Sequence, residues 1–419
     1  MTSPSRRREN DFPRNLTMNR RQMMLGAASM ALGGGLAASN ASARQGHSPN
    51  QPATATSGGP PPLMTMLGMV PDGIAADSDD TRVNWTYTDI ARQFDALGLP
   101  HGIDGFDLEN NAFIDAIVPL KFGSHVFDYS RVEEFIGFQP MGVDQALYVV
   151  GAESSFSLFR ADFDVERLVA AWLASGYEPV ETASGVPAWT IGPEGEFDLD
   201  HPIQGSVLRQ FNNVAVVDDI LIYNSRMDLL ERALSIAENG EPSMASDPVF
   251  GPLAESLPET TVSALSLPPI PPDLGFVVMS DEEREPIEAA FEEALWEFGS
   301  MPASTGIITA VSAGAIPLDW EWPLENGTPS PNARENAGTA YIRMGMASPE
   351  DAATASEVAA GRWNSLRSLL TLMPYTDMAE VAAAEASGNV AMLDLVQLER
   401  ARLWSHMFEI KDVLPFVPV

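Results

Sequence analysis

The chain has 419 residues, of which 58 are Asp or Glu and 24 are Lys or Arg, so its formal net charge is −34 at pH 7. So acidic a protein repels nucleic acid and anionic lipid, and we favour a solvated, salt-adapted surface over cation capture as the reason for the acidity. The absence of cysteine excludes disulfides, thiolate metal sites, a cysteine nucleophile, covalently attached haem and a lipidated N-terminal cysteine.

The N-terminus carries an export signal. Arg20 and Arg21 precede a weakly apolar run rich in Gly and Ala, which is too short and too weakly apolar for a membrane span. Ala41 and Ala43 then supply the small residues that a signal peptidase requires. The segment resembles a twin-arginine signal, with Asn19 in the place of the usual Ser or Thr. An ordinary secretory signal and an uncleaved anchor are the alternatives.

The resemblance implies that residues 1–43 are a signal peptide recognised by the export machinery and cut after Ala43. The mature protein is then extracytoplasmic: periplasmic, attached to the cell wall or secreted. Residues 44–62 are rich in Pro, Ser, Gly and Thr, and we predict a disordered tether there, with ordered structure from about Leu63. No later apolar run is long enough to span a membrane, so no transmembrane segment is predicted in the mature chain.

Residues 63–144 give mixed signals, and we interpret them as an N-terminal support layer. The sequence VNWTY at 83–87 alternates like a strand. Residues 89–97 and 129–136 are typical of short helices.

Residues 145–267 form the clearest predicted unit. The strand-like SFSLFRADF leads into a helix that Asp164 caps and Gly176 ends. The apolar residues of that helix recur at spacings of three and four and therefore share one face: Val165, Leu168, Val169, Trp172 and Leu173.

The same unit continues with a strand in GVPAWTIG and a hairpin that turns at Asp218 and Asp219. A helix capped by Ser225 and closed by Gly240 follows, and TVSALSL is the last strand. This order favours an antiparallel sheet with helices on one face. The pattern FRADFD…GY…GVPAW…NVAVVDDIL, within 140–260, resembles a loose set of exported bacterial proteins, and the resemblance implies no activity.

The proline-rich stretch 268–275 predicts a domain boundary, and residues 276–419 form a second α+β lobe. A strand is again followed by a helix, with Ser348 at the cap and Pro349 at the first helical position. NVAMLDLVQL parallels NVAVVDDILIY, with Val214 and Val390 heading the two copies. We therefore predict two duplicated ferredoxin-like lobes, with chance similarity as the alternative.

No motif for a metal, a cofactor or a nucleophile stands out, so the catalytic residues are unknown and no cofactor is predicted. The five histidines are isolated from one another: His47, His101, His125, His201 and His406. Three clusters remain as candidates. An acidic row could bind a hard cation such as Ca²⁺ if it is extended, although a solvated loop is the simpler interpretation: Glu194, Glu196, Asp198 and Asp200, followed by His201.

The second cluster is LDWEWP, in which Trp320 and Trp322 share one face of a strand and could stack a sugar ring. The flanking Asp319 and Glu321 could then hydrolyse a glycoside, whereas the simpler interpretation places both tryptophans in the core. The third is GIDGFDLENN, whose acidic residues are typical of turns: Asp104, Asp107 and Glu109.

Together these features predict an exported cell-envelope protein that is not a catalyst and that binds a small ligand or an envelope protein. The alternative is an extracytoplasmic, glycan-directed hydrolase that uses carboxylates.

Overall fold

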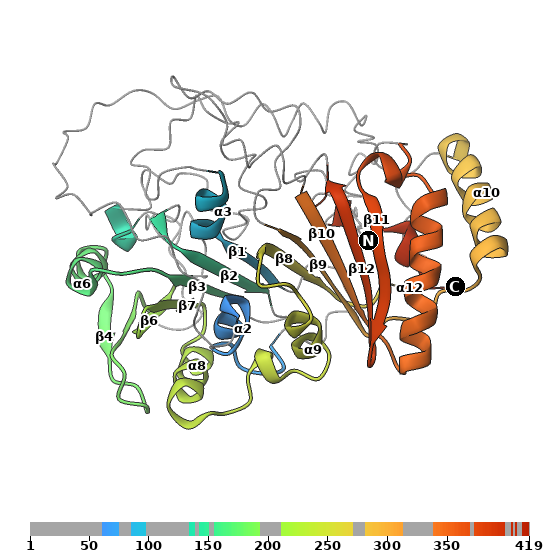
Figure 1. Cartoon of the computed structure of the whole chain (residues 1–419). Helices are drawn as coiled ribbons and strands as arrows, with labels where there is room; N and C mark the ends of the chain where they lie inside the picture. Colours follow the sequence, from blue (N-terminus) through green and yellow to red (C-terminus); the bar gives the residue numbers. More distant parts are fainter. Residues whose placement is uncertain are drawn as a thin grey trace, which may run out of the picture. The chain divides into compact units, whose positions relative to one another are not determined.

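A computed structural model describes residues 61–74, 85–97, 134–138, 142–150, 155–192, 211–270, 281–312, 338–368, 373–398, 404, 407–408 and 413–418. Residues 59–419 form one compact unit, and the predicted signal peptide lies outside the described residues. The fold is α+β, with a large antiparallel sheet and several helices (Figure 1).

Twelve described strands form one sheet in the order β11-β12-β10-β9-β8-β1-β2-β3-β7-β6-β5-β4. Their bounds are β1 (Trp85–Asp89), β2 (Gln145–Val150), β3 (Ser155–Arg160), β4 (Glu178–Val180), β5 (Ala188–Thr190), β6 (Asn213–Val217), β7 (Ile220–Asn224), β8 (Thr261–Leu267), β9 (Gly306–Ser312), β10 (Gly338–Gly345), β11 (Glu380–Ser387) and β12 (Val390–Leu398). Strand β1, from the predicted support layer, lies between β2 and β8 of the first predicted lobe, and β8 pairs with β9 of the second.

The described helices are α2 (Pro62–Leu67), α3 (Ile90–Leu97), α6 (Val165–Ala174), α8 (Met227–Asn239), α9 (Phe250–Glu255), α10 (Asp281–Phe298) and α12 (Pro349–Ser365), with the short 3₁₀ helices η3 (Met244–Ser246), η4 (Tyr375–Asp377) and η5 (Leu414–Phe416). Within the described ranges, no helix combines the length and the apolar character needed to cross a membrane.

The predicted helix caps are largely confirmed. Asp164 accepts a hydrogen bond from the Arg167 amide at 3.1 Å, and the Ser348 hydroxyl accepts one from the Asp351 amide at 3.1 Å. These bonds satisfy amides of the first turn that have no partner inside the helix. The predicted cap at Ser225 is wrong, because α8 has Arg226 at its N-cap position.

Helices cover both faces of the sheet, so the prediction of helices on one face is wrong. Alternate residues of a strand point to opposite faces. In β6 and β7, Val214 and Tyr223 pack with Trp172 of α6, whereas Ala215 and Ile222 pack with the α8 side of the sheet. Both sets of side chains are apolar, so each face needs a cover. Helix α6 buries only Leu168 and Trp172 fully, and Val165 and Leu173, which the spacing placed on the same face, are exposed.

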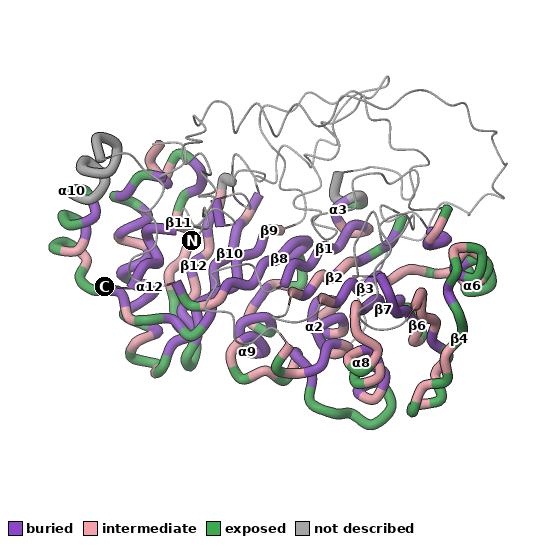
Figure 2. The backbone as a smooth tube through the Cα atoms, turned by 180° about the vertical axis from the view of Figure 1, so that it is seen from behind, coloured by how far each residue is buried: buried purple, intermediate pink, exposed green. Residues whose placement is uncertain are grey.

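The second part of the sheet has its main core on one face. Helix α12 packs on β11 and β12, and α10 packs on α12. Trp363 of α12 and Trp404 are buried in the same cluster, and the Trp404 indole donates to Thr309 Oγ1 at 2.8 Å. Strands β8, β9 and β10 between the two parts are almost wholly buried (Figure 2).

The predicted match of Val214 to Val390 is wrong in register. Val214 lies in β6, the first strand of a hairpin, whereas Val390 begins β12, the second strand of another hairpin. Residues 390–398 form a single strand, although the first copy turns at Asp218 and Asp219 within the matched stretch.

Candidate functional site

None of the site residues chosen from the sequence falls within the described part of the chain. This holds for the export signal, the acidic row, the tryptophan pair, the third acidic cluster and the histidines: Arg20, Arg21, Ala41 and Ala43; Glu194, Glu196, Asp198 and Asp200; Trp320 and Trp322; Asp104, Asp107 and Glu109; His47, His101, His125, His201 and His406. Within the described ranges, no three His, Cys, Asp or Glu residues gather in a way that could hold a metal ion.

The outermost described strand at one end of the sheet, β11, is the candidate site. It has the sequence EVAAAEAS and pairs with β12 through a two-residue turn at Gly388 and Asn389. Gly388 has a φ of +54°, the left-handed conformation that such a turn favours and that glycine adopts without strain. Five of its eight residues are exposed, including Glu380 and Glu385.

The geometry of the β11–β12 hairpin determines which main-chain groups of β11 point away from β12. In a two-residue hairpin, the residues flanking the turn exchange both hydrogen bonds, and the next pair exchanges none. Ser387 therefore bonds to Val390, and Glu385 bonds to Met392. The amides and carbonyls of Ala384 and Ala386 point away from β12, toward the open edge.

The two faces of β11 differ. Val381 and Ala384 pack on the apolar cluster beneath α12, which fixes the strand against the helix. Glu385 lies on the opposite face, where its cross-strand partner is Met392. A bulge between Val381 and Ala383 interrupts the pairing near the start of the strand. The regular part of the edge therefore runs from Ala383 to Ser387.

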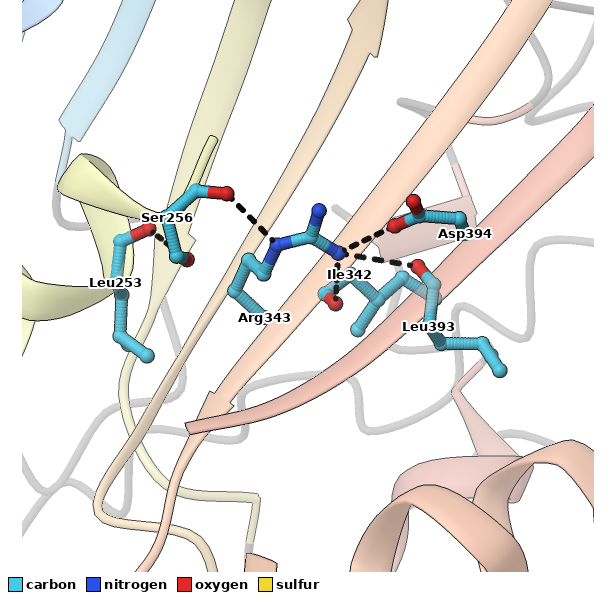
Figure 3. A network of polar contacts seen from close by, with 6 residues as sticks. All are labelled: Leu253, Ser256, Ile342, Arg343, Leu393 and Asp394. Carbon is cyan, nitrogen blue, oxygen red and sulfur yellow. Dashed lines mark hydrogen bonds and ion pairs between the residues drawn. The ribbon is translucent and has the colours of Figure 1, made fainter. Parts of the chain in front are cut away.

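A buried arginine holds the strand that carries β11 (Figure 3). The Nη1 of Arg343 in β10 donates to Asp394 Oδ1 of β12 at 2.7 Å and to the Ile342 carbonyl at 3.0 Å. It also lies 3.4 Å from the Leu393 carbonyl, and Nε donates to the Ser256 carbonyl, at the end of α9, at 3.3 Å. One guanidinium thereby ties β10, β12 and α9 together, directly beside the edge hairpin.

The Arg343–Asp394 pair also shapes the charge near the edge. Its two side chains are 4% and 37% exposed, so the cation is hidden and the carboxylate reaches the surface. Asp394 lies opposite Ala383 of β11. With Glu380 and Glu385, the surface next to the edge is therefore anionic.

A second polar cluster lies at the centre of the sheet, where Asp89 ends β1. Its carboxylate accepts from the Arg92 amide at 3.0 Å, from the Tyr87 hydroxyl at 3.4 Å and from Gln145 Nε2 at 3.4 Å. Burial raises the pKa of the Asp89 carboxyl, while its hydrogen bonds and the charge of Arg92 oppose that rise in part. The side chain is only 4% exposed, and Asp89 directly precedes α3, so this carboxyl acts as a helix cap.

Arg362, in the last turn of α12, is another buried arginine of the described part of the chain. It donates to the Val417 carbonyl at 2.8 Å and to the Gly299 carbonyl at 3.0 Å, and it lies over the Phe291 ring. Burial lowers its pKa to about 10. Its bonds join α12 to the residues after α10 and to the described C-terminal segment, so its role is structural.

The sequence pattern of residues 380–387 does not predict a strand. The stretch is rich in Ala and Glu, which favour helices, and it lacks the apolar alternation of a half-buried strand. The signal that could have found it is the turn Gly388-Asn389, which stands directly before an apolar strand.

Comparisons with known proteins add little to this geometry. No family model matches the chain, and no curated protein matches it. A solved structure described as "Structure of crystal form I of TP0453" is similar with a TM-score of 0.32 and 10% identity, over 82% of this chain and 96% of that one. A likeness this remote carries no argument about function.

Proposed function

We propose that this is an exported cell-envelope protein that binds a protein partner along the open edge of its sheet and catalyses no reaction. The export half of the proposal rests on the twin-arginine pattern around Arg20 and Arg21 and on the small residues before Ala43. The binding half rests on the described part of the chain.

The observation that carries the binding proposal is the outer edge of β11, with which no described strand pairs. An unpaired edge presents a row of main-chain donors and acceptors to a further strand. The β11 edge directs those of Ala384 and Ala386 outward, and the short alanine side chains leave the main chain within reach. Adding a strand to such an edge is a common way of binding an extended segment.

The alternative, a glycan-directed hydrolase, needs an accessible carboxyl that can hold a proton. Asp89 has the raised pKa of such a group. However, both of its oxygens accept hydrogen bonds from neighbouring groups, and its burial leaves no access for a sugar. Asp89 is therefore not the acid of such a hydrolase, and the carboxyls that the sequence suggests for it, Asp319 and Glu321, lie outside the described residues.

The proposal includes an origin for the architecture: two copies of one ferredoxin-like unit. Strands β2-β3-β7-β6 and β9-β10-β12-β11 follow the same spatial order. In each set a helix, α6 or α12, stands between the second strand and the hairpin, and in the first set β4 and β5 follow the helix before the hairpin begins. The connectivity is that of a ferredoxin-like βαββαβ unit that begins at its last strand. Strands β1 and β8 then occupy equivalent places and pair antiparallel at the centre.

Both halves of the proposal can be tested in the native host. Replacing Arg20 and Arg21 with Lys should abolish export, because twin-arginine recognition requires both guanidinium groups. For binding, a photo-crosslinking amino acid at Ala386 should give a discrete protein adduct in intact cells. The matched control is the same amino acid at Ala174, an exposed alanine of α6. Export that is unchanged, or equal adducts at the two positions, would refute the corresponding half.

A further inference from the structure

We infer that the β11 edge receives an extended, cationic segment with a large apolar residue, which runs antiparallel to β11 and takes the place that β5 takes on β6. The inference rests on the proposed function and names the chemistry of the partner.

The hairpins β6–β7 and β11–β12 have the same turn geometry and occupy corresponding places in the sheet. Both β6–β7 and β11–β12 turn over two residues, and the first residue of each turn is left-handed, with a φ of +52° at Asp218 and +54° at Gly388. Aligning the turns places Val214 of β6 on Ala384 of β11. Both side chains face the same kind of neighbour, the apolar layer under α6 or α12.

The next strands extend the match. In the first half of the sheet, formed by β2, β3, β7 and β6, Asn224 of β7 pairs with Phe156 of β3. In the second half, formed by β9, β10, β12 and β11, Asp394 of β12 pairs with Tyr341 of β10, and this pair corresponds to Asn224 with Phe156. The register therefore agrees across three strands, so the outer edges of β6 and β11 occupy equivalent places.

The outer edge of β6 is covered by another strand of the protein. Strand β5 pairs antiparallel with β6, so that Ala188 lies opposite Ala215, and Trp189 opposite Val214. The ring of Trp189 packs 5.0 Å from that of Trp172 on α6. The protein thus covers one of its two equivalent edges with a short strand of its own, anchored by an aromatic side chain. At the β11 edge, no described strand takes this place.

The positions of Trp189 and Ala188 opposite β6 indicate which residues the partner segment carries on β11. The place of Trp189 lies opposite Ala384, which packs on the apolar cluster beneath α12, so the equivalent residue of the partner is a large apolar one. The place of Ala188 lies opposite Glu385, an exposed carboxylate where the first half has the buried Ala215. Opposite charges across a strand pair stabilise it, and like charges destabilise it. The segment therefore carries a Lys or Arg beside its apolar residue.

The same charges argue against a second copy of this chain as the occupant. Each copy carries a net charge of −34 and would bring its own Glu380 and Glu385 to the shared edge. A partner segment of opposite charge meets attraction instead, and attraction of this kind raises association rates at low salt.

The test is titration of the purified protein with a labelled short peptide that alternates Lys with Thr around one Trp, read by fluorescence anisotropy. Ala386→Pro removes an amide that faces outward, so it should spare the hairpin and weaken binding about tenfold or more. The matched control, Ala386→Val, keeps the amide and should bind within about twofold of the wild type. Thermal melting checks that both variants are folded.

Two further peptides make the result independent of protein folding. N-methylation of the Trp amide should abolish binding, because that amide donates to β11. Replacing Lys with Glu should abolish binding through repulsion by Glu385. Equal binding of the plain and N-methylated peptides, or of the Lys and Glu peptides, would overturn the inference. So would a wild-type protein that is dimeric by light scattering and loses the dimer with Ala386→Pro.

The two proposals fail in different ways. A specific crosslink from Ala386 in cells, together with no binding of the Lys peptide in vitro, would overturn the cationic-strand inference and leave protein binding intact. No crosslink from Ala386 would count against the proposed function itself.

Discussion

The two ends of the described sheet are finished in opposite ways. At one end, β4 has three residues, includes Pro179 and ends a pair of short strands that covers β6. At the other end, β11 has eight residues and no proline, and no described strand pairs with its outer edge. Short edge strands and proline are devices that keep sheets from adding strands. Among the described strands, only the β6 edge is covered in this way, which is the reason for assigning a binding role to the β11 edge.

Removing the Trp189 side chain should destabilise the end of the sheet where β5 covers β6. Trp189→Ala removes the ring that packs on Trp172, and we expect it to lower the free energy of unfolding by about 3 kcal/mol. Urea denaturation measures the change. Val165→Ala, at an exposed apolar side chain of the same half, should cost less than about 0.5 kcal/mol. Similar costs for the two variants would mean that Trp189 does not anchor β5.

The Arg343–Asp394 ion pair of the second half can be replaced by the residues found at the corresponding positions of the first half. Arg343 occupies the place of Leu158, and Asp394 the place of Asn224. Arg343→Leu alone should cost about 2 kcal/mol, because it removes four hydrogen bonds and leaves carbonyls of β12 and α9 without their donor. Arg343→Leu with Asp394→Asn should recover part of that loss. A double variant that is less stable than the single variant would contradict the account.

The two turns give a smaller test. Gly388→Ala places a side chain at a φ of +54° and should cost about 1 kcal/mol. Gly388→Asp copies Asp218 of the other hairpin and should cost less than the alanine variant, since Asp tolerates the left-handed region better than Ala does. Chemical denaturation of the two variants decides the order, and the reverse order would show that the turns differ in conformation.

The smallest effect concerns the centre of the sheet, where the two halves meet. The pKa of Asp89 is raised in the folded protein, so the folded state holds the proton more tightly than the unfolded state does. Its contribution to stability is complete below the unfolded pKa, which is about 4, and is lost as the pH rises through the folded pKa. Asp89→Asn removes this dependence and keeps a capping side chain.

The stability of Asp89→Asn relative to the wild type should therefore increase from acid to neutral pH. Denaturation of both proteins across that range measures the difference. Taking the difference removes the contribution of the other carboxylates. A difference that stays constant with pH would mean that the Asp89 pKa is not raised.

The sequence predicted the local elements well. Asp164 and Ser348 cap helices, Gly176 and Gly240 follow helix ends, and Asp218-Asp219 turns a hairpin, because each depends on residues close by in the chain. These preferences follow from the local chemistry of caps and turns.

The arrangement of the elements was harder to predict. The place of β1 between β2 and β8 depends on pairing with residues far along the chain. Strand β11 has the composition of a helix, and only its pairing with β12 and its contact with α12 make it a strand. The equivalence of Val214 with Ala384 depends on hairpin position rather than on residue type, so sequence similarity pointed to Val390 instead.

The most direct test of the central claim is amide hydrogen exchange at Ala384 and Ala386, with and without the alternating Lys–Thr peptide. If the peptide adds a strand to β11, exchange at these two amides should slow markedly, while the Glu385 and Ser387 amides, already bonded to β12, should change little. Saturating peptide that leaves exchange at Ala384 and Ala386 unchanged would contradict the account.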